Sequence, residues 1–437
     1  MAYSVGLYTL GCKVSQYETE AIAEAFCEAG FVRRPFREAC DVYVINTCTV
    51  TREADRKSRQ CIRRALSRNP DARVLVCGCY SQTTPQEVAA IDGVSYVSGT
   101  YGKMRLPAVA LDLLSRPKEA VTVEVTDVDE APFEPMCVRE SPRTRAYVKI
   151  EDGCECRCTY CAIPAARGRV RSKPMEDVLA EVKALADRGT EEVVLTGIET
   201  ASWGVDLDGV RLIDLLEKLD GAGYVSRIRL GSLSPEVMTD AFIDRISRLR
   251  SVCPQFHVSM QSGSDTVLRG MKRRYNTARA LSSMEKLRAA MPSVQFTTDM
   301  MVGFPGESEA LFEETLDFTR RARFLDMHVF AYSRRCGTPA DTYEGQVPEA
   351  VKAERSHRLT VLQNGIRDEI LDAVVQAGTP LRMIPETLLD GVWSGHSDAF
   401  LPLAMQAHPL VAHGRPVQVV PLSYADGVIH VRFDKEI

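Results

Sequence analysis

Three cysteines near the middle of the chain have the spacing that iron-sulfur chemistry requires. Cys154, Cys158 and Cys161 form a C-x3-C-x2-C pattern in the loop 153–161, directly after an apolar stretch. Three thiolates at this spacing can hold three irons of a 4Fe-4S cube and leave the fourth iron open. A zinc site or a set of buried thiols is the alternative, but three cysteines within eight residues, with the aromatic Tyr160 before the last one, favour the cube.

The open iron is the chemical reason to expect S-adenosylmethionine (SAM) as a cofactor. In radical SAM chemistry this iron chelates the amino and carboxylate groups of SAM, and an electron from the cluster cleaves the sulfonium to a 5'-deoxyadenosyl radical. Cys156 gives the loop a competing C-x-C-x-C spacing. We assign Cys156 as a spectator, because a residue two positions from Cys154 is expected to point away from the cube.

A second group of cysteines follows strands in the first 116 residues. Short apolar runs alternate there with amphipathic stretches, which predicts a parallel α/β sheet. Cys12, Cys48 and Cys79 each follow an expected strand. Because the carboxyl ends of parallel strands lie at one edge of a sheet, these cysteines are expected to converge. The repeated placement predicts a second metal site, although one such cysteine alone is more often a small buried residue.

The expected strands of this first segment are 5–9, 42–45, 73–76 and 94–97, and its expected helices are 18–29, 54–67 and 103–114. The second helix lies in a strongly basic stretch, 52–73. A charge-rich helix is often only a solvated face. Because this one begins beside the second predicted cluster, we favour a phosphate-binding role for it.

The middle of the chain predicts an open, partial barrel. Residues 117–143, rich in proline and acidic residues, are expected to be a linker or extended hairpin. Residues 144–374 repeat a strand-helix unit, with expected strands 147–150, 192–196, 226–230, 255–259, 294–299 and 326–332 and helices 175–187, 213–219, 235–246, 278–290 and 309–321. Six such units are too few for the eight-stranded barrel, and in partial barrels the chemistry sits at the carboxyl ends of the strands.

Glycine-bearing loops follow several of these strands and are expected to let the backbone approach a ligand closely. The cysteine loop follows the first strand, and loops at 196–199, 260–264 and 301–307 follow later ones. As single motifs they are weak, since glycine after a strand is commonly only a turn. We take these residues as the candidates for SAM contact: Tyr160, Gly197, Ile198, Gln261 and Ser262.

The last segment, 375–437, predicts a small β-barrel. Its expected strands are 388–392, 401–404, 417–421 and 428–433, separated by turns such as 394–398. A small barrel beside an enzyme domain is often a module that holds nucleic acid, but composition alone allows a structural cap equally well.

Composition sets the outer limits. The chain has 437 residues, 45% of them hydrophobic and 26% charged, which is typical of a soluble globular protein of about two to four domains. Fourteen cysteines without a secretion signal indicate a reducing, cytoplasmic location. No stretch predicts a membrane-spanning helix. The net charge of -5 argues against a protein that coats nucleic acid indiscriminately, but it leaves room for local basic patches.

Several stretches resemble the methylthiotransferases of the radical SAM superfamily. They are GCKVSQYETE at 11–20, NTCTVT at 46–51, GCYSQ at 78–82 and, after the cysteine loop, QSGS at 261–264. The resemblance covers the chain nearly end to end, and its last segment is similar to a divergent TRAM domain. The residues GCKV at 11–14, together with YSRR at 332–335 and GTPA at 337–340, are most similar to the MtaB branch of this family. Ser15 and Cys156 depart from the usual pattern, and neither departure removes a ligand.

The resemblance implies a reaction on tRNA in which SAM has two roles. In such enzymes the central cysteines hold the SAM-cleaving cluster, and the three N-terminal cysteines hold an auxiliary 4Fe-4S cluster that carries the sulfur. One SAM methylates that sulfur, and a second gives the radical that removes hydrogen from C2 of N6-threonylcarbamoyladenosine at position 37, beside the anticodon. No acid-base side chain could do this, because that C2–H is too weakly acidic. The base must leave the stacked anticodon loop, which single-stranded RNA permits.

The threonylcarbamoyl group is anionic, so this branch predicts local positive charge near the substrate. Candidate sources are the helical stretch 52–73 and the runs 167–171 and 272–274. The sister branch acts on isopentenyladenosine, whose isopentenyl group requires an apolar pocket instead. Two further classes stay open: a methylthiotransferase acting on a ribosomal-protein aspartate, and a plain iron-sulfur carrier or RNA-binding scaffold. The expected partners are tRNA, an electron donor such as flavodoxin or ferredoxin, and a sulfur donor, with no membrane.

Overall fold

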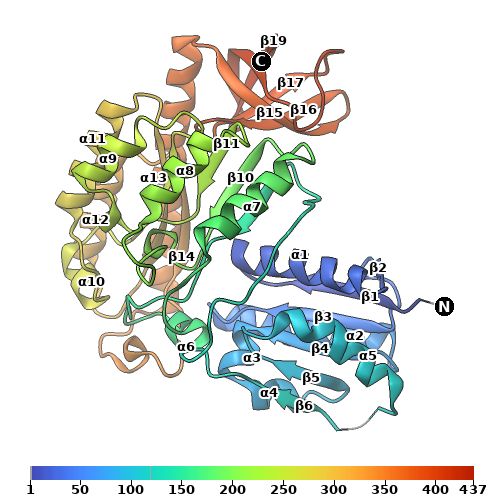
Figure 1. Ribbon diagram of the computed structural model, residues 1–437. Helices are drawn as coiled ribbons and strands as arrows, with labels where there is room; N and C mark the ends of the chain where they lie inside the picture. The colour runs from blue at the N-terminus through green and yellow to red at the C-terminus, as the bar shows by residue number, and fades with distance from the viewer. Residues whose placement is uncertain (1, 119) are drawn as a thin grey trace.

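The structure is a computed structural model that describes residues 2–118 and 120–437. It has three parts, which we call the N-terminal sheet, the central barrel and the C-terminal barrel (Figure 1). The N-terminal sheet lies at the lower right of the view, the C-terminal barrel lies at the top, and the central barrel joins them. This arrangement, an α/β chain that ends in a small β-barrel, confirms the predicted fold class.

The N-terminal sheet has six parallel strands in the order β2-β1-β3-β4-β5-β6. Buried apolar side chains cover both faces, as a parallel sheet requires. Its elements are β1 (Ser4–Thr9), α1 (Lys13–Glu28), β2 (Val32–Arg34), β3 (Val42–Thr47), α2 (Arg52–Arg68), β4 (Arg73–Gly78), α3 (Cys79–Thr83), α4 (Pro85–Ala89), β5 (Val94–Ser98), η1 (Lys103–Arg105), α5 (Leu106–Ser115) and β6 (Thr122–Glu124).

Helix α1 begins at Lys13, earlier than the start expected at residue 18. Cys12 occupies the N-cap position in extended conformation and makes no side-chain capping hydrogen bond. The residue types that signal a helix start are therefore missing from the sequence at this point. The earlier start places Cys12 at the positive end of a long helix, where negative charge is favoured.

The central barrel consists of two three-stranded parallel sheets, β7-β10-β11 and β12-β13-β14, which isolated parallel bridges join into one curved wall. The six-stranded partial barrel is thus confirmed. Its elements are β7 (Arg145–Lys149), β8 (Glu151–Asp152), α6 (Ile163–Arg167), β9 (Arg171–Ser172), α7 (Met175–Ala186), β10 (Glu192–Thr196), η2 (Thr200–Ser202), α8 (Leu212–Ala222), β11 (Arg227–Leu230), η3 (Pro235–Val237), α9 (Asp240–Ile246), β12 (Gln255–Gln261), α10 (Asp265–Gly270), α11 (Thr277–Ala290), β13 (Gln295–Val302), α12 (Glu309–Ala322), β14 (Asp326–Ala331) and η4 (Pro339–Thr342).

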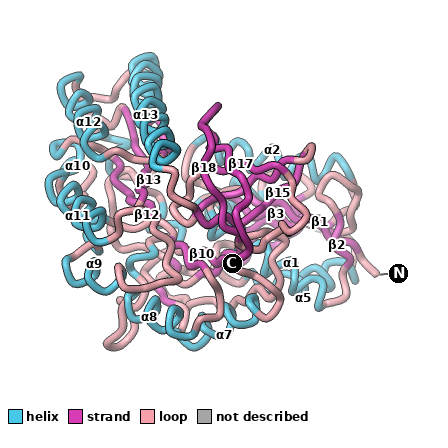
Figure 2. Tube along the Cα trace, turned by 90° about the horizontal axis from the view of Figure 1, so that it is seen from above, coloured by secondary structure: helices cyan, strands magenta, loops and turns pink. Residues whose placement is uncertain are grey.

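Helices α8 to α12 stand on the outer side of this wall, away from the N-terminal sheet (Figure 2). Their apolar faces and the strands share one large buried core. The long helix α13 (Glu349–Ala377) adds Leu359 to that core and Leu371 to the core of the C-terminal barrel. Helix α13 therefore packs against both the central barrel and the C-terminal barrel.

The C-terminal barrel is closed, with the strand order β15-β16-β17-β19-β18. Its strands are β15 (Leu381–Leu389), β16 (Val392–Ser397), β17 (Pro402–Gln406), β18 (Val417–Ala425) and β19 (Val428–Glu436). The expected strand 388–392 is wrong, because a turn lies inside it: Asp390 and Gly391 have φ of 48° and 78°, which suits the two-residue hairpin turn that Asp-Gly favours. The expected turn at 394–398 is also wrong, since most of it belongs to β16.

None of the helices in the described ranges combines the length and the apolar character that crossing a bilayer requires.

Candidate active site

The three N-terminal cysteines lie together at one edge of the sheet. β1, β3 and β4 are adjacent and their ends are aligned, and Cys12, Cys48 and Cys79 follow those ends. Each thiol has the other two within electrostatic range. A Cβ atom added to Gly11 would stand 3.3 Å from Sγ of Cys48, so the chain after β1 approaches Cys48 closely. The sheet thus brings together the residues that the sequence placed far apart.

Burial governs the protonation of two of these thiols. It raises the pKa of Cys48 to about 12, although a backbone hydrogen bond from Val50 opposes it. Burial also raises the pKa of Cys79, against the opposing charge of Arg167. Iron must therefore displace protons to bind these residues as thiolates.

Arg167 connects this edge to the central barrel. It is the last residue of α6, which begins two residues after Cys161, and its side chain is fully buried. Its Nε donates a hydrogen bond to Sγ of Cys79 at 3.2 Å, and its Nη1 donates to Oε1 of Glu18 at 2.5 Å and to Oδ2 of Asp152 at 3.1 Å. One side chain thus joins α6, α1, α3 and β8.

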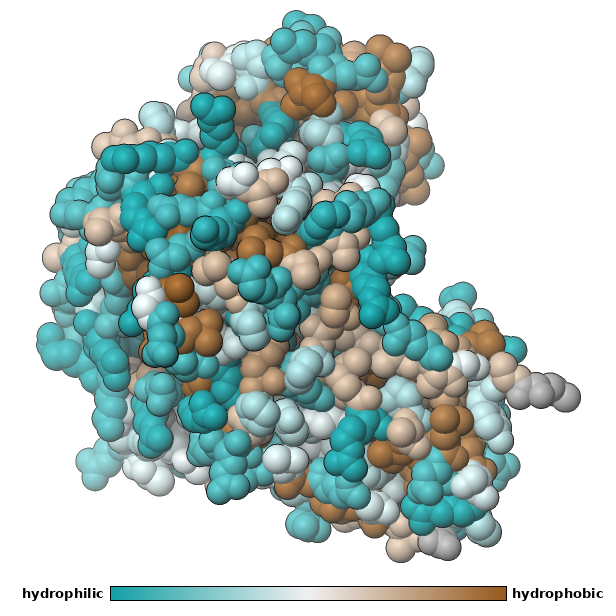
Figure 3. Space-filling model, in the orientation of Figure 1, coloured by the Kyte–Doolittle hydropathy of each residue, from teal (hydrophilic) through white to brown (hydrophobic). Residues whose placement is uncertain are grey.

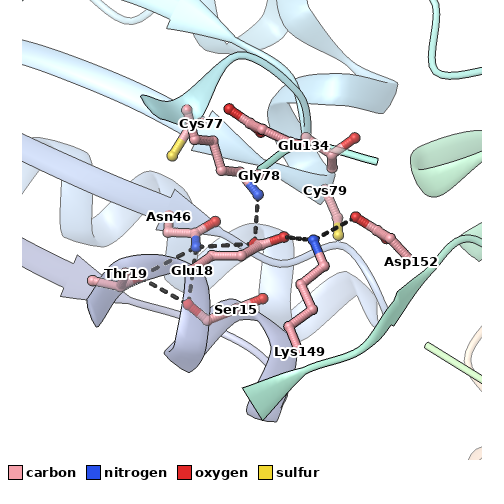
Figure 4. A network of polar contacts seen from close by, with 12 residues as sticks. Ser15, Glu18, Thr19, Asn46, Cys77, Gly78, Cys79, Glu134, Lys149 and Asp152 are labelled. Atoms are coloured by element: carbon pink, nitrogen blue, oxygen red, sulfur yellow. Dashed lines mark hydrogen bonds and ion pairs between the residues drawn. The ribbon is translucent and has the colours of Figure 1, made fainter. Parts of the chain in front are cut away.

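A network of buried charges surrounds this contact. Figure 4 shows Glu18 between Asn46 and Lys149. Asp152 lies beyond Lys149, and Cys79 lies beside Asp152. Nζ of Lys149 lies 2.8 Å from Glu18 and 2.6 Å from Asp152, and Lys103 also donates to Glu18. Burial alone disfavours the ionised forms of Glu18 and Asp152. The neighbouring cations, Arg167 first, outweigh it and hold the pKa of Glu18 well below its usual range.

The balance of this network is positive. Four buried cations, Lys103, Lys149, Arg167 and Arg171, contact two carboxylates, Glu18 and Asp152. Burial opposes ionisation of Asp152, but Arg167 and Lys149 lower its pKa to about 2. A third carboxyl, Glu134, has its pKa raised by burial.

Buried charges are stable only when an opposite charge meets them. The excess of cations beside Cys79 therefore suits an anionic group such as thiolate-ligated iron-sulfur. The donor set and the surrounding charge both fit a cluster at this edge.

The central cysteines line a cavity of about 270 Å³ at the carboxyl ends of the barrel strands. Cys154, Cys158 and Cys161 share its wall with residues from β12, β13, β14 and the segment after β14. Burial raises the pKa of Cys161 to about 12, so iron must displace a proton there as well. The arrangement leaves open space next to three thiols, as a cluster with an additional ligand requires.

Within the described ranges, no three His, Cys, Asp or Glu side chains close around one point as the ligands of a single metal ion do. In a cube the thiolates bind separate irons, so its ligands stand apart.

Cys156 lines the same cavity, contrary to the expectation that it points away. A hydrogen bond between the Cys154 and Cys156 thiols lowers the pKa of Cys156 to about 6 and raises that of Cys154. Arg157 lies between Cys156 and Cys158. It adopts a left-handed conformation with φ of 48°, which turns the loop. The role of Cys156 as a spectator stays a prediction.

Arg273 contacts the central cysteines as Arg167 contacts the N-terminal ones. Its Nη1 donates to Sγ of Cys158 at 3.3 Å, its Nε donates to the Tyr275 hydroxyl at 2.7 Å, and its Nη2 donates to the Ser259 carbonyl at 2.8 Å. Each cysteine group therefore has one arginine that donates to one sulfur. Hydrogen bonds to cluster sulfurs tune reduction potential.

The five candidates for SAM contact divide into two groups. Tyr160, Ile198 and Gln261 line the cavity. Gly197 and Ser262 stand behind that lining: a Cβ on Gly197 would meet Glu151 at 2.5 Å, and Ser262 is fully buried. Gln261 has φ of 66°, a strained value for a residue other than glycine, and such strain clusters at binding sites. Contact with SAM stays a prediction for all five.

Two of the basic runs differ from the expectation of an RNA-facing surface. Arg167 and Arg171 are buried: Arg167, at the end of α6, donates to Asp152, and the antiparallel pair β8–β9 places Arg171 opposite Asp152. Arg273 is turned toward the cysteine cavity by its bonds to Tyr275 and Cys158. A run of arginines in sequence does not reveal which members face inward, so these roles were missed.

Comparisons with known proteins agree with this geometry. Residues 148–319 match the radical SAM superfamily, and residues 4–99 match the uncharacterized protein family UPF0004. The chain is 41% identical over 405 residues to the threonylcarbamoyladenosine tRNA methylthiotransferase MtaB of Bacillus subtilis (strain 168), covering 91% of this chain and 89% of that protein. The chain belongs to the radical SAM methylthiotransferase family. The resemblance noted in the sequence is thereby confirmed.

Other members of the methylthiotransferase family also match over most of their length. The MtaB of Thermotoga maritima is 35% identical over 434 residues, covering 99% of this chain and 97% of that protein. A tRNA-2-methylthio-N(6)-dimethylallyladenosine synthase of Carboxydothermus hydrogenoformans is 36% identical over 374 residues, with coverages of 83% and 84%.

Among solved structures, the fold of this methylthiotransferase resembles that of the radical S-adenosylmethionine methyltransferase TsrM from Kitasatospora setae, with cobalamin and a 4Fe-4S cluster bound. The TM-score is 0.58 at 15% identity, covering 95% of this chain and 84% of that one. At this identity the likeness concerns the fold alone.

Proposed function

We propose that the chain is a tRNA methylthiotransferase that converts N6-threonylcarbamoyladenosine at position 37, beside the anticodon, to its 2-methylthio derivative. SAM serves as methyl donor and radical source, and two 4Fe-4S clusters, one on each cysteine group, supply the radical chemistry and the sulfur. Relatives that are 41% and 35% identical over most of the chain carry the name of this activity.

One observation carries the proposal: α6 leads directly from one cysteine group to the other. The helix begins next to Cys161 and ends at Arg167, whose guanidinium contacts Cys79. The hydroxyl of Thr100, at the edge of the N-terminal sheet, donates to the carbonyl of Ala166 in the same helix at 2.8 Å. A substrate base between the two groups can therefore face both, which transfer of sulfur to a radical carbon requires.

In this proposal the residues of the chain bind SAM, orient the two cysteine groups and shield the site from water. Tyr160, Ile198 and Gln261 line the cavity and contact SAM in this proposal, and Arg167 and Arg273 each donate to one cysteine sulfur. The buried charges around Glu18 hold α1, and with it Cys12, against the barrel. These contacts set the distance between the two groups and exclude water from the space behind them.

The choice of nucleoside rests on charge. An anionic threonylcarbamoyl group needs local positive charge, whereas the dimethylallyl group needs an apolar pocket. Arg52, Arg56, Lys57, Arg63 and Arg64 of α2 are exposed, and a second group of cations lines a large cavity, described below. The sister activity remains the second candidate because relatives with that name are 33–36% identical to the chain. Modification of a ribosomal-protein aspartate is the third.

We also propose four segments: 1–116 with the auxiliary cluster, the linker 117–143, the radical SAM barrel 144–374, and the TRAM-like barrel 375–437. The enzyme acts in the cytoplasm. It takes electrons from a donor such as flavodoxin or ferredoxin, and sulfur from a separate donor.

The deciding experiment offers anaerobically reconstituted enzyme two tRNAs side by side, one carrying N6-threonylcarbamoyladenosine and the other isopentenyladenosine. Nucleoside mass spectrometry should show a methylthio product only in the first. Conversion of only the isopentenyl substrate overturns the nucleoside assignment. Activity on ribosomal protein with none on either tRNA overturns the assignment to RNA.

A further inference from the structure

A second and larger cavity, of about 640 Å³, lies between the three parts of the molecule. Its walls are residues of the six barrel strands, the start of α1, the segment before β7, and residues of β15 and of loops in the C-terminal barrel. Figure 3 shows the outline of the molecule notched between the C-terminal barrel and the N-terminal sheet, the parts that supply opposite walls. A cavity of this size holds a modified nucleoside.

The cavity adjoins the smaller cysteine cavity. His257 lines the large cavity and Asp299 lines the small one, and His257 Nε2 lies 3.3 Å from Oδ2 of Asp299. The linings of the two cavities therefore meet at this pair of side chains. A base held in the large cavity is next to the site proposed for SAM.

Four basic side chains of lysine and arginine line the large cavity, and three are engaged. Arg143 lies 3.4 Å from a carboxylate oxygen of Glu20, Arg145 pairs with Glu386, and Arg229 donates to Glu192 at 2.6 Å. The fourth is Lys13, which is exposed and has no hydrogen-bond or ion-pair partner among the described residues.

Phe400 holds two of the engaged cations in place. The guanidinium carbons of Arg145 and Arg229 lie 5.2 Å and 4.9 Å from its ring centroid, and its φ of 65° is strained. A strained residue that persists is held by its surroundings. These arginines are thus fixed parts of the wall, and among the described residues Lys13 is the lysine or arginine of this wall that is left free for a ligand.

We propose that Lys13 binds the threonyl carboxylate of the substrate base. Lys13 directly follows Cys12, so its backbone lies at the edge proposed to carry the sulfur, and its side chain lines the large cavity. In the modified base the substituent on C6 is separated from C2 by only one ring atom, N1. When C2 faces that edge, the carboxylate at the end of the substituent comes to the same side. This inference rests on the proposed function, and it names a residue that selects the nucleoside.

The test measures binding by the reconstituted holoenzyme, with both clusters, to three anticodon stem-loop RNAs. They differ only at the modified base, which carries the threonylcarbamoyl group, its carboxylate methyl ester, or no modification. Wild-type enzyme should bind the acid at least about tenfold more tightly than the ester, the range expected for one charge-assisted hydrogen bond. Lys13→Met should bring that ratio close to one and leave affinity for the ester unchanged. Lys13→Arg should restore part of the preference.

Lys183→Met is the matched control, because Lys183 is exposed on α7 and pairs with Asp187 at the end of that helix; it should keep the wild-type ratio. Iron content shows that each variant holds its clusters. Equal loss of affinity for acid and ester would assign Lys13 to an RNA phosphate and overturn the proposal, as would an unchanged ratio in Lys13→Met. Either result, with conversion of the threonylcarbamoyl RNA intact, leaves the proposed function standing. Conversion of only the isopentenyl substrate removes the proposed function instead.

Discussion

Nε of Arg167 donates a hydrogen bond to Sγ of Cys79 at 3.2 Å, and it does so from the helix that follows Cys161. The contact crosses from the central barrel to the edge of the N-terminal sheet. It combines a hydrogen bond with a fixed positive charge at one proposed ligand of the auxiliary cluster. Both effects favour the more negative, reduced form of a cluster.

We therefore expect Arg167→Gln to lower the midpoint potential of the auxiliary cluster and Arg167→Lys to lower it less. The lysine keeps the charge but cannot reach Glu18, Asp152 and Cys79 with one planar group. EPR-monitored redox titration in a background that lacks the three central cysteines isolates the auxiliary signal. An unchanged potential in Arg167→Gln with full iron content would contradict a tuning role.

The same substitution should destabilise the fold, because it removes the buried guanidinium that donates to Glu18, Asp152 and Cys79. Loss of one partner from a buried ion pair costs about 3–5 kcal/mol. Arg248→Gln is the control, since Arg248 forms an exposed pair with Asp244 and such pairs contribute about 0–1 kcal/mol. Thermal unfolding of the two variants separates them. A small, equal shift in both would mean that the network contributes little.

The two cysteine groups should load iron independently. We expect about eight irons in the reconstituted wild type and about four in the triple variant Cys154→Ala, Cys158→Ala, Cys161→Ala, since each trio suits one cube. That variant should lose SAM cleavage. Single replacement of Cys12, Cys48 or Cys79 by Ala should keep reductive formation of 5'-deoxyadenosine and abolish the methylthio product. Retained SAM cleavage in the triple variant would refute the assignment of the central loop.

Cys156 needs a separate test, because its thiol stands in the cavity next to Cys154. We expect Cys156→Asp to keep both clusters and nearly full turnover, since the C-x3-C-x2-C trio is complete without it. The hydrogen bond that now joins the two sulfurs is lost when Cys154 binds iron. Iron analysis and the EPR signal of the SAM-cleaving cluster measure the result. Loss of one cluster's iron would identify Cys156 as a ligand.

Strand ends made the cysteine positions predictable. Cys12, Cys48 and Cys79 follow apolar runs whose parallel pairing forces them to one edge, and this depends only on element order. The Asp390-Gly391 turn is also readable in principle, but apolar residues on both sides of it favour the prediction of one continuous strand. Local sequence patterns therefore predict the strands, except where a turn interrupts an apolar run.

The buried charges were not predictable. Glu18, Lys149 and Arg167 belong to three separate elements, and nothing in their local sequence distinguishes them from surface residues. Their partners are set by how the N-terminal sheet packs on the central barrel, which is a tertiary relationship. Lys13 shows the same limit, because only the folded structure reveals that it has no hydrogen-bond or ion-pair partner among the residues described.

Helix α2 offers the last test, on the recognition of tRNA. Arg63 and Arg64 are exposed on this helix, and neither guanidinium has a hydrogen-bond or ion-pair partner among the described residues. Arg335, from the segment after β14, lies 2.6 Å from Asp55 of the same helix and fixes it to the barrel. The two arginines are therefore presented on a rigid surface, free to contact phosphates.

We expect the double variant Arg63→Glu, Arg64→Glu to bind tRNA at least about tenfold more weakly at low salt, since each lost phosphate contact removes counterion release. The slope of log affinity against log salt should become shallower by about one to two. SAM cleavage without tRNA should be unchanged. Arg320→Glu, Arg321→Glu on α12 is the matched control, because it reverses the charge of two adjacent exposed arginines on the outer wall. Equal losses in the two double variants would show that the effect comes from net charge alone and not from a tRNA contact on α2.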